Sequence, residues 1–149
     1  METKNNIKYR IDSIGKEEFS LNIEGVDLSN INDLTLKFQY KIETLLKMKD
    51  NLILVKPSVR LLYNDSPVLT ASVVVSYNVR TLENAFSIDR ENQQINIKAD
   101  ILPDFIGASY STLRGIVYAR TIETPLATFP IPMIKTHTLI SKKAIRVEE

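Results

Sequence analysis

The chain has 149 residues, of which 44% are hydrophobic and 25% are charged, so it is long enough to bury a core and is unlike a disordered or fibrous protein. Its 19 basic and 18 acidic residues give a formal net charge of +1, which supplies no broad field for holding nucleic acid. It contains no cysteine, which excludes disulfide bonds and thiolate metal sites. We expect a single domain over residues 1–149 that does not bind nucleic acid.

The N-terminal sequence METKNNIKYR lacks the apolar segment of a signal peptide. No run in the chain approaches the ~18 consecutive apolar residues of a membrane span. The absence of cysteine also suits the reducing environment of the cytoplasm. These features predict a cytoplasmic protein that is not inserted into a membrane.

Alternating apolar and polar residues predict strands in the first part of the chain. Two shorter alternating pieces, Ile7 to Ile14 and Phe19 to Ile23, predict a first strand and its return, divided near Gly15. The clearest alternation is LTLKFQYKIE at residues 34–43, which is typical of a half-buried strand. Its apolar face includes Phe38.

Two further strands are predicted between residues 52 and 80. The first runs from Leu52 to Tyr63 and contains Pro57, whose missing N–H favours a sheet edge or a bulge. A turn at Asn64 to Pro67 is followed by VLTASVVVSYNVR at 68–80. Because the turns are short, we expect these strands to form an antiparallel meander.

The hydrophobic period changes from two to about 3.6 near Ala99. Apolar residues then recur at three- and four-residue steps as far as about Arg120, which predicts one long amphipathic helix. Gly107 and Gly115 weaken this helix and indicate close approach of another backbone. The charged tail SKKAIRVEE predicts at most a short terminal helix or turn. Together the elements predict an α+β fold.

The residues that usually carry catalysis are sparse or separated. His137 is the only histidine, which excludes a multi-histidine metal site, and the four glycines are too far apart to form a phosphate-binding loop. The acidic pair Glu17 and Glu18 lies in a strand pattern whose neighbouring side chains point apart. We therefore expect no enzyme activity, no metal and no cofactor.

The most distinctive feature of the sequence is its apolar and aromatic surface. One amphipathic helix can cover only part of one face of a sheet, and Val68 and Val74 make the second face of their strand partly apolar. A monomer would therefore leave apolar surface in water. This excess favours self-association, binding of extended apolar ligands, or both.

Two parts of the sequence form a distinctive pattern. In the first, Tyr110 to Arg114 lies in the predicted helix, and Thr121 to Thr128 leads into the Phe-Pro segment at Phe129 to Ile134. In the second, at the front of the chain, the aromatic Tyr9 precedes spaced isoleucines within Lys8 to Ile14 and is followed by Phe19. Both parts resemble the SecB family of export chaperones. The resemblance spans roughly residues 7–135, and its specific part is the helix with the Phe-Pro segment.

This resemblance implies a four-stranded antiparallel sheet with one long helix and a short or absent C-terminal helix. It also implies a homo-oligomer, a dimer of dimers, that binds unfolded polypeptide without ATP. Two prolines stiffen the Phe-Pro loop, so its apolar side chains could form one wall of a peptide groove. On this hypothesis the groove is lined by Phe38, Tyr40, Val75, Tyr77, Phe129, Ile131 and Met133. The oligomer interface is formed by Phe105, Tyr110, Leu113, Ile116 and Val117.

Some features depart from the family. General export chaperones of this type are acidic, whereas this chain is neutral and carries Lys142, Lys143 and Arg146 near its end. Docking on the export motor therefore stays open, and a dedicated client such as an antitoxin is an alternative to general export. A different class also stays open: a non-chaperone adaptor or assembly protein whose helix and loop form only a fixed oligomer interface.

Overall fold

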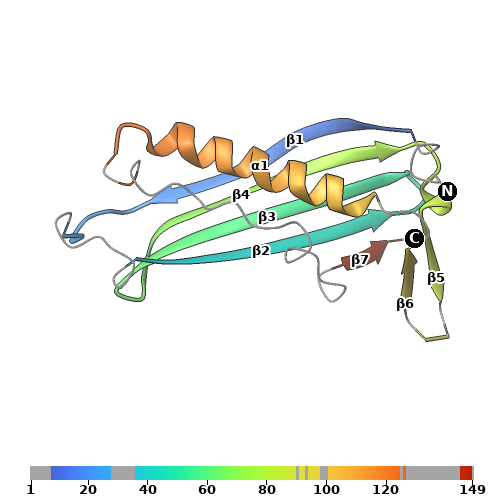
Figure 1. The fold of residues 1–149 in the computed structure, drawn as a ribbon, viewed down its shortest axis with the longest axis horizontal. Coiled ribbons are helices and arrows are strands. Elements are labelled where there is room, and N and C mark those ends of the chain that lie inside the picture. The colour runs from blue at the N-terminus through green and yellow to red at the C-terminus, as the bar shows by residue number, and fades with distance from the viewer. Residues whose placement is uncertain are drawn as a thin grey trace.

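The computed structural model describes residues 8–27, 36–89, 91–92, 94–97, 101–124, 126 and 145–148. Its elements are β1 (Tyr9–Leu21), β2 (Leu36–Lys47), β3 (Leu52–Tyr63), β4 (Ser66–Val79), the 3-10 helix η3 (Leu82–Asn84), β5 (Phe86–Asp89), β6 (Gln94–Ile97), α1 (Leu102–Thr121) and β7 (Ile145–Glu148). Within these residues α1 lies across one face of a five-stranded sheet (Figure 1). The predicted α+β class is confirmed.

The strand order in the sheet is β1-β4-β3-β2-β7. β2, β3 and β4 form the predicted antiparallel meander, and β1 adds to β4 in antiparallel orientation. β7 pairs with β2 in parallel over Thr44 to Lys47, so the sheet is mixed. The prediction of a purely antiparallel four-stranded sheet is therefore wrong at this edge. The tail expected to form a turn or short helix contributes a strand, in which Ile145 and Val147 alternate with charged residues.

β1 is one strand of 13 residues, although the sequence predicted a strand and a return. Its pairing with β4 shifts between Ile11 and Ser13 and again between Gly15 and Glu18. Lys16, within the second shift, has a φ of 49°. The interruption near Gly15 is therefore a bulge that lets the strand continue in the same direction.

Pro57 lies in β3, between β4 and β2, so the prediction of an edge position is wrong. On the β2 side Pro57 is opposite Ile42. On the β4 side no residue is paired between Val55 and Ser58, while the register is the same before and after the gap. The missing N–H of proline therefore falls where the β3–β4 ladder is already interrupted.

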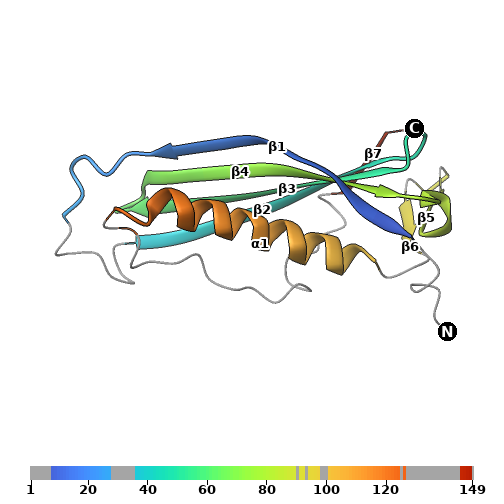
Figure 2. The same cartoon turned by 90° about the horizontal axis from the view of Figure 1, so that it is seen from above.

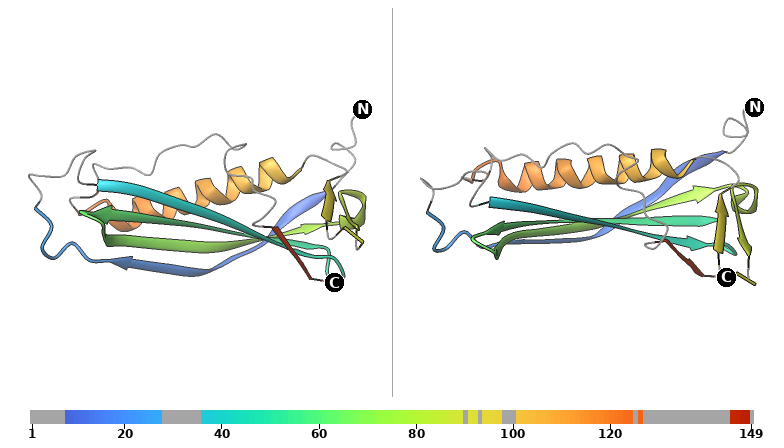
Figure 3. Two further views of the ribbon diagram at one scale, coloured as in Figure 1. Left: turned by 90° about the horizontal axis from the view of Figure 1, so that it is seen from below. Right: turned by 60° about the horizontal axis from the view of Figure 1, so that its bottom comes forward.

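The predicted helix is confirmed as α1, which has 20 residues and carries Pro103 in its first turn. Its side chains facing the sheet recur at three- and four-residue steps, and Figures 2 and 3 show the helix on one face of the sheet only. The buried residues of α1 are Leu102, Phe105, Ile106, Ser109, Tyr110, Leu113, Val117 and Thr121. A Cβ added at Gly115 would meet nothing within 4 Å, so the expected close approach is not made within this chain at Gly115.

An aromatic cluster fixes the N-terminal half of α1 to the sheet. The rings of Tyr77 and Phe105 stack with centroids 4.4 Å apart, and Tyr9 meets Phe105 edge-on at 4.7 Å. The Tyr77 hydroxyl donates to the Phe105 carbonyl oxygen at 3.1 Å and lies 2.7 Å from the Ser109 hydroxyl. Burial raises the pKa of Tyr77, while the Ser109 hydrogen bond lowers it. This cluster connects β1, β4 and α1.

The two ends of the sheet are held differently. At the C-terminal end of α1, Arg120 donates from Nε and Nη2 to Glu17 Oε1 at 3.0 and 2.7 Å, which ties the helix to the bulge of β1. At the other end, η3 and the β5–β6 hairpin follow β4 (Figure 1). Leu82 of η3, Phe86 of β5 and the intervening Ala85 are buried and close that end of the core.

We expect Tyr77→Phe to lower the free energy of unfolding by about 1–3 kcal/mol, because it leaves the buried Ser109 hydroxyl and the Phe105 carbonyl without the tyrosine hydroxyl. Urea denaturation of both proteins measures the difference. Tyr118→Phe is the matched control, since Tyr118 is 57% exposed and should change stability by less than about 0.5 kcal/mol. Equal stability of the Tyr77→Phe variant and the parent would contradict this account of how α1 is attached.

Candidate functional site

Both long edges of the sheet are open in the described part of the chain. β1 forms one edge along its whole length. On the other edge, β7 covers only Thr44 to Lys47 of β2, and no strand among the described residues pairs with the outer side of residues 36–43. A strand edge presents a row of backbone N–H and C=O groups to any extended chain that approaches it.

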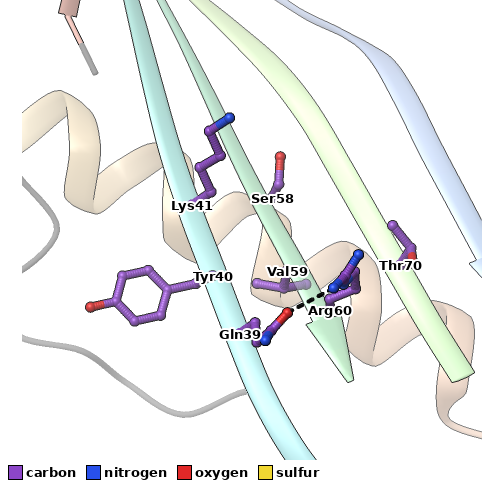
Figure 4. Close-up of a pocket in the computed structure, with 7 residues that line it drawn as sticks. All are labelled: Gln39, Tyr40, Lys41, Ser58, Val59, Arg60 and Thr70. Carbon is purple, nitrogen blue, oxygen red and sulfur yellow. Dashed lines mark hydrogen bonds between the residues drawn. The ribbon is translucent and has the colours of Figure 1, made fainter. Parts of the chain in front are cut away.

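Two aromatic side chains stand beside the open part of β2, on the face that α1 covers. Phe38 and Tyr40 are opposite Leu61 and Val59 of β3, and their rings are stacked with centroids 5.9 Å apart. Phe38 is half-buried and Tyr40 is 41% exposed. Figure 4 shows the Tyr40 ring extending sideways from β2, away from β3. The pair therefore presents aromatic surface directly beside the strand edge.

Tyr110 of α1 interacts electrostatically with Tyr40. Its side chain is buried, and burial raises its pKa to about 12, against a smaller lowering by the charge of Arg114. The charge of Tyr40 makes a further contribution to raising this pKa. Because Tyr110 is only 3% exposed, it offers no surface to a ligand, and we call Phe38, Tyr40 and the backbone edge of residues 36–43 the β2-edge site.

β7 provides direct evidence that this edge accepts an added strand. Four residues near the C-terminus, Ile145 to Glu148, pair in parallel with β2 immediately beyond the open segment. Ile145 is buried there, so the added strand gains both backbone pairing and apolar contact. The same edge continues without a register shift into residues 36–43, where β2 stays paired with β3.

The other predicted groove residues have different environments. Val75 and Tyr77 are 0% and 2% exposed beneath α1, so a bound peptide could reach them only if the helix moved away. They belong to the core of the chain, because β4 is an interior strand covered by the helix. Phe129, Ile131 and Met133 lie outside the described residues.

Four of the five residues predicted for the oligomer interface pack against the chain's own sheet. These are Phe105, Tyr110, Leu113 and Val117, all buried within the single chain. Ile116 is the fifth and keeps partial exposure. An amphipathic pattern identifies the apolar side of a helix but not which surface covers it, and here that surface is β3 and β4.

Sequence reasoning missed the exposed apolar residues on the other edge. Ile11 and Ile14 of β1 are 55% and 52% exposed, and Ile122 directly follows α1 with similar exposure. Ile11 and Ile14 lie on the α1 face of β1, opposite Tyr77 and Val75 of β4 respectively. Their alternation was visible in the sequence, but the edge position that exposes them was not.

The described residues contain no group of three or more side chains suited to hold a metal ion. Within the same ranges no helix combines the length and the apolar character needed to cross a bilayer.

Comparisons with known proteins add one finding. No protein-family model matches the sequence, and no curated protein matches it. Among solved structures, the chain is similar to the Mycobacterium tuberculosis Rv1957 SecB-like chaperone in complex with a ChAD peptide from the Rv1956 HigA1 antitoxin. The alignment has a TM-score of 0.49 and 13% sequence identity, and covers 86% of this chain and 87% of that one.

The environment of Tyr110 predicts a loss of stability at high pH. Its folded-state pKa is about 12, above the ordinary value of 10.0, so the folded chain holds a proton that the unfolded chain releases between these pH values. The stability is complete below about pH 10 and falls as the pH rises towards 12. Tyr110→Phe should make this fall shallower, as measured by urea denaturation at a series of alkaline pH values.

Tyr118→Phe is the control for this measurement, because it removes an exposed phenol from the same helix and leaves the titration of the other groups in place. If Tyr110→Phe and Tyr118→Phe lose stability with pH at the same rate, burial of Tyr110 does not produce the effect.

Proposed function

We propose that this protein is an ATP-independent molecular chaperone that binds unfolded or extended polypeptide along the β2-edge site. The observation that carries the proposal is the stacked pair of half-buried Phe38 and exposed Tyr40 beside an open strand edge to which β7 already adds a strand. The resemblance of the helix and the Phe-Pro segment to the SecB family supports the same function.

Binding at a strand edge explains how varied clients are accepted. Backbone hydrogen bonds to residues 36–43 do not depend on the client's sequence, and they form only with an extended chain. Apolar client side chains on the α1 face would cover Phe38 and Tyr40, at roughly 25 cal/mol per Å² of apolar surface removed from water. No nucleotide is needed, because the free energy comes from this burial and pairing.

The clients we propose are newly made or unfolded chains in the cytoplasm, including export substrates or a dedicated client such as an antitoxin. The absence of cysteine in the sequence supports a cytoplasmic location. Docking on an export motor is not part of the proposal, since the chain carries a net charge of only +1.

The β1 edge is suited to a second copy of the same chain. If two β1 strands pair antiparallel about a two-fold axis at Ile14, residues equally distant from Ile14 are opposite each other. Arg10 then faces Glu18 of the other copy, and Asp12 faces Lys16. The two bulges of β1 lie on either side of Ile14, so the first bulge of one copy faces the second bulge of the other copy. We propose that this pairing builds the homodimer from which a dimer of dimers can form.

The alternative is an adaptor or assembly protein in which apolar surface serves only a fixed interface. The exposed Ile11, Ile14 and Ile122 are compatible with that role as well. The two functions differ in one respect: an adaptor keeps no aromatic site free for unfolded chains after it has assembled.

Suppression of aggregation tests the chaperone function. Stoichiometric protein should delay light scattering from a reduced, unfolded polypeptide, and Tyr40→Ser should raise the concentration needed by about fivefold or more because it removes exposed aromatic surface. Tyr118→Ser is the matched control, an exposed tyrosine on α1 that lies outside the β2-edge site. A stable oligomer that leaves aggregation unchanged would favour the adaptor function.

Charge exchange tests the β1 pairing. Arg10→Glu and Glu18→Arg should each raise the dimer dissociation constant, by about tenfold, since each places like charges opposite each other twice in the dimer. The combined Arg10→Glu, Glu18→Arg variant should restore association, because the exchanged charges are again complementary. Sedimentation velocity measures all four proteins. Failure of the combined variant to recover would exclude this register.

A further inference from the structure

The face of the sheet opposite α1 carries a shallow groove of about 250 Å³ next to the open edge of β2. It is lined by Gln39, Tyr40, Lys41, Ser58, Val59, Arg60 and Thr70. Figure 4 shows these residues with α1 behind the sheet, so the groove and the helix are on opposite faces. Five of these seven residues, all but Tyr40 and Val59, have polar or charged side chains, which distinguishes the groove from the aromatic side of the same edge.

The guanidinium of Arg60 is held at the edge of the sheet. Gln39 and Arg60 are cross-strand partners, and Arg60 Nη2 donates to Gln39 Oε1 at 3.0 Å. This contact brings the charge of a β3 residue over β2. Lys41 is the next residue along β2 on the same face, and its partner on β3 is Ser58. An arginine side chain has five N–H donors, so the bond to Gln39 leaves donors for a ligand.

Charges on this face favour an acidic ligand. Lys41 and Arg146 both approach the carboxylate of Glu43, at 3.8 and 3.7 Å, so one anion is shared by two cations. Lys56 lies on the same face as the cross-strand partner of Glu43. Arg60 makes its side-chain hydrogen bond to a neutral amide.

The acidic groups of Asp65 and Glu18 on this side of the sheet do not reverse the balance. Lys37 forms an ion pair with Asp65 at 3.0 Å, which leaves that pair neutral. Glu18 of β1 is opposite Ser72 of β4, with β4 and β3 between it and β2. The edge of the groove where a client strand would lie is therefore lined by cations in excess.

A strand added to β2 would present its side chains alternately to the two faces of the sheet. Side chains on one face would meet Phe38 and Tyr40, and those on the other would meet Lys41 and the Arg60 guanidinium. Each face thus selects every second residue of the client.

We propose that the preferred client segment is an extended strand in which apolar or aromatic residues alternate with aspartate or glutamate. The acidic side chains lie in the groove on the face opposite α1, and the carboxylates accept hydrogen bonds from Lys41 and Arg60. This inference rests on the proposed binding of extended chains at the β2 edge and adds the client's charge pattern.

Three peptides that differ only in the polar positions test it. Each is long enough to span residues 36–43 and alternates valine with glutamate, glutamine or lysine, and each carries the same fluorophore. Fluorescence anisotropy with the full chain should give an affinity for the glutamate peptide about tenfold above that for the glutamine peptide, with the lysine peptide weakest. The advantage of glutamate should shrink as salt is added.

Variants of the chain locate the source of the preference. Arg60→Gln and Lys41→Gln should each reduce the advantage of the glutamate peptide, and Arg60→Glu with Lys41→Glu should transfer the preference to the lysine peptide. Lys49→Gln is the matched control, since it removes one positive charge from the exposed β2–β3 turn outside the groove. Unchanged melting temperatures of these variants would show that the changes arise from binding.

The outcomes of the peptide-binding experiment distinguish failure of the inference from failure of the proposed function. Equal affinities for the glutamate and glutamine peptides would overturn the inference while leaving the proposed function intact. A preference for glutamate that persists in the Arg60→Gln and Lys41→Gln variants would place the acidic side chains elsewhere and would also overturn it. If none of the three peptides binds, the proposed function fails and the inference fails with it.

Discussion

The main constraint on this fold is that one helix has to cover a sheet wider than itself. α1 is about 10 Å across with its side chains, whereas four strands at a spacing of about 4.8 Å span nearly twice that width. The Tyr77–Phe105 stack and the two hydrogen bonds of the Tyr77 hydroxyl fix the helix over the interior of the sheet, where it contacts β3 and β4. The core is closed there, and both edges of the sheet extend beyond the helix. The exposed apolar residues of the strands follow from this difference in width.

The two edges differ in how they restrict pairing. β1 is interrupted by two bulges and carries alternating charges, features that prevent indiscriminate strand addition while permitting one complementary register. β2 has no register shift against β3 and carries stacked aromatic residues at its open end. Its other end is covered by β7, whose four residues occupy only part of the edge. A regular, aromatic edge suits varied extended partners, whereas a bulged, charged edge suits one fixed partner.

The sequence predicted which segments form strands and the helix better than it predicted which side chains are exposed. Alternation placed Phe38 and Tyr40 on one face of a strand, and the structure keeps both beside an open edge. The same kind of alternation selected Val75 and Tyr77, which are buried because β4 is an interior strand. Periodicity identifies the face of a strand, but its neighbours depend on the order of strands, which involves residues far apart in the chain. Ile145 shows the same limit, since a four-residue strand becomes recognisable only when β2 is beside it.

The proposed binding at a strand edge would also provide a route for client release without ATP. An edge recognises a chain only while that chain is extended, and a folded client hides the same segment in its own structure. At a chaperone concentration one hundred times the dissociation constant, binding opposes client folding by about 2.7 kcal/mol. Typical domains gain about 5–15 kcal/mol on folding, so a client able to fold leaves the edge spontaneously. A client unable to fold alone, or one that needs its own partner to fold, stays bound until that partner arrives. The moderate affinity expected of a short open edge is thus consistent with both protection and release.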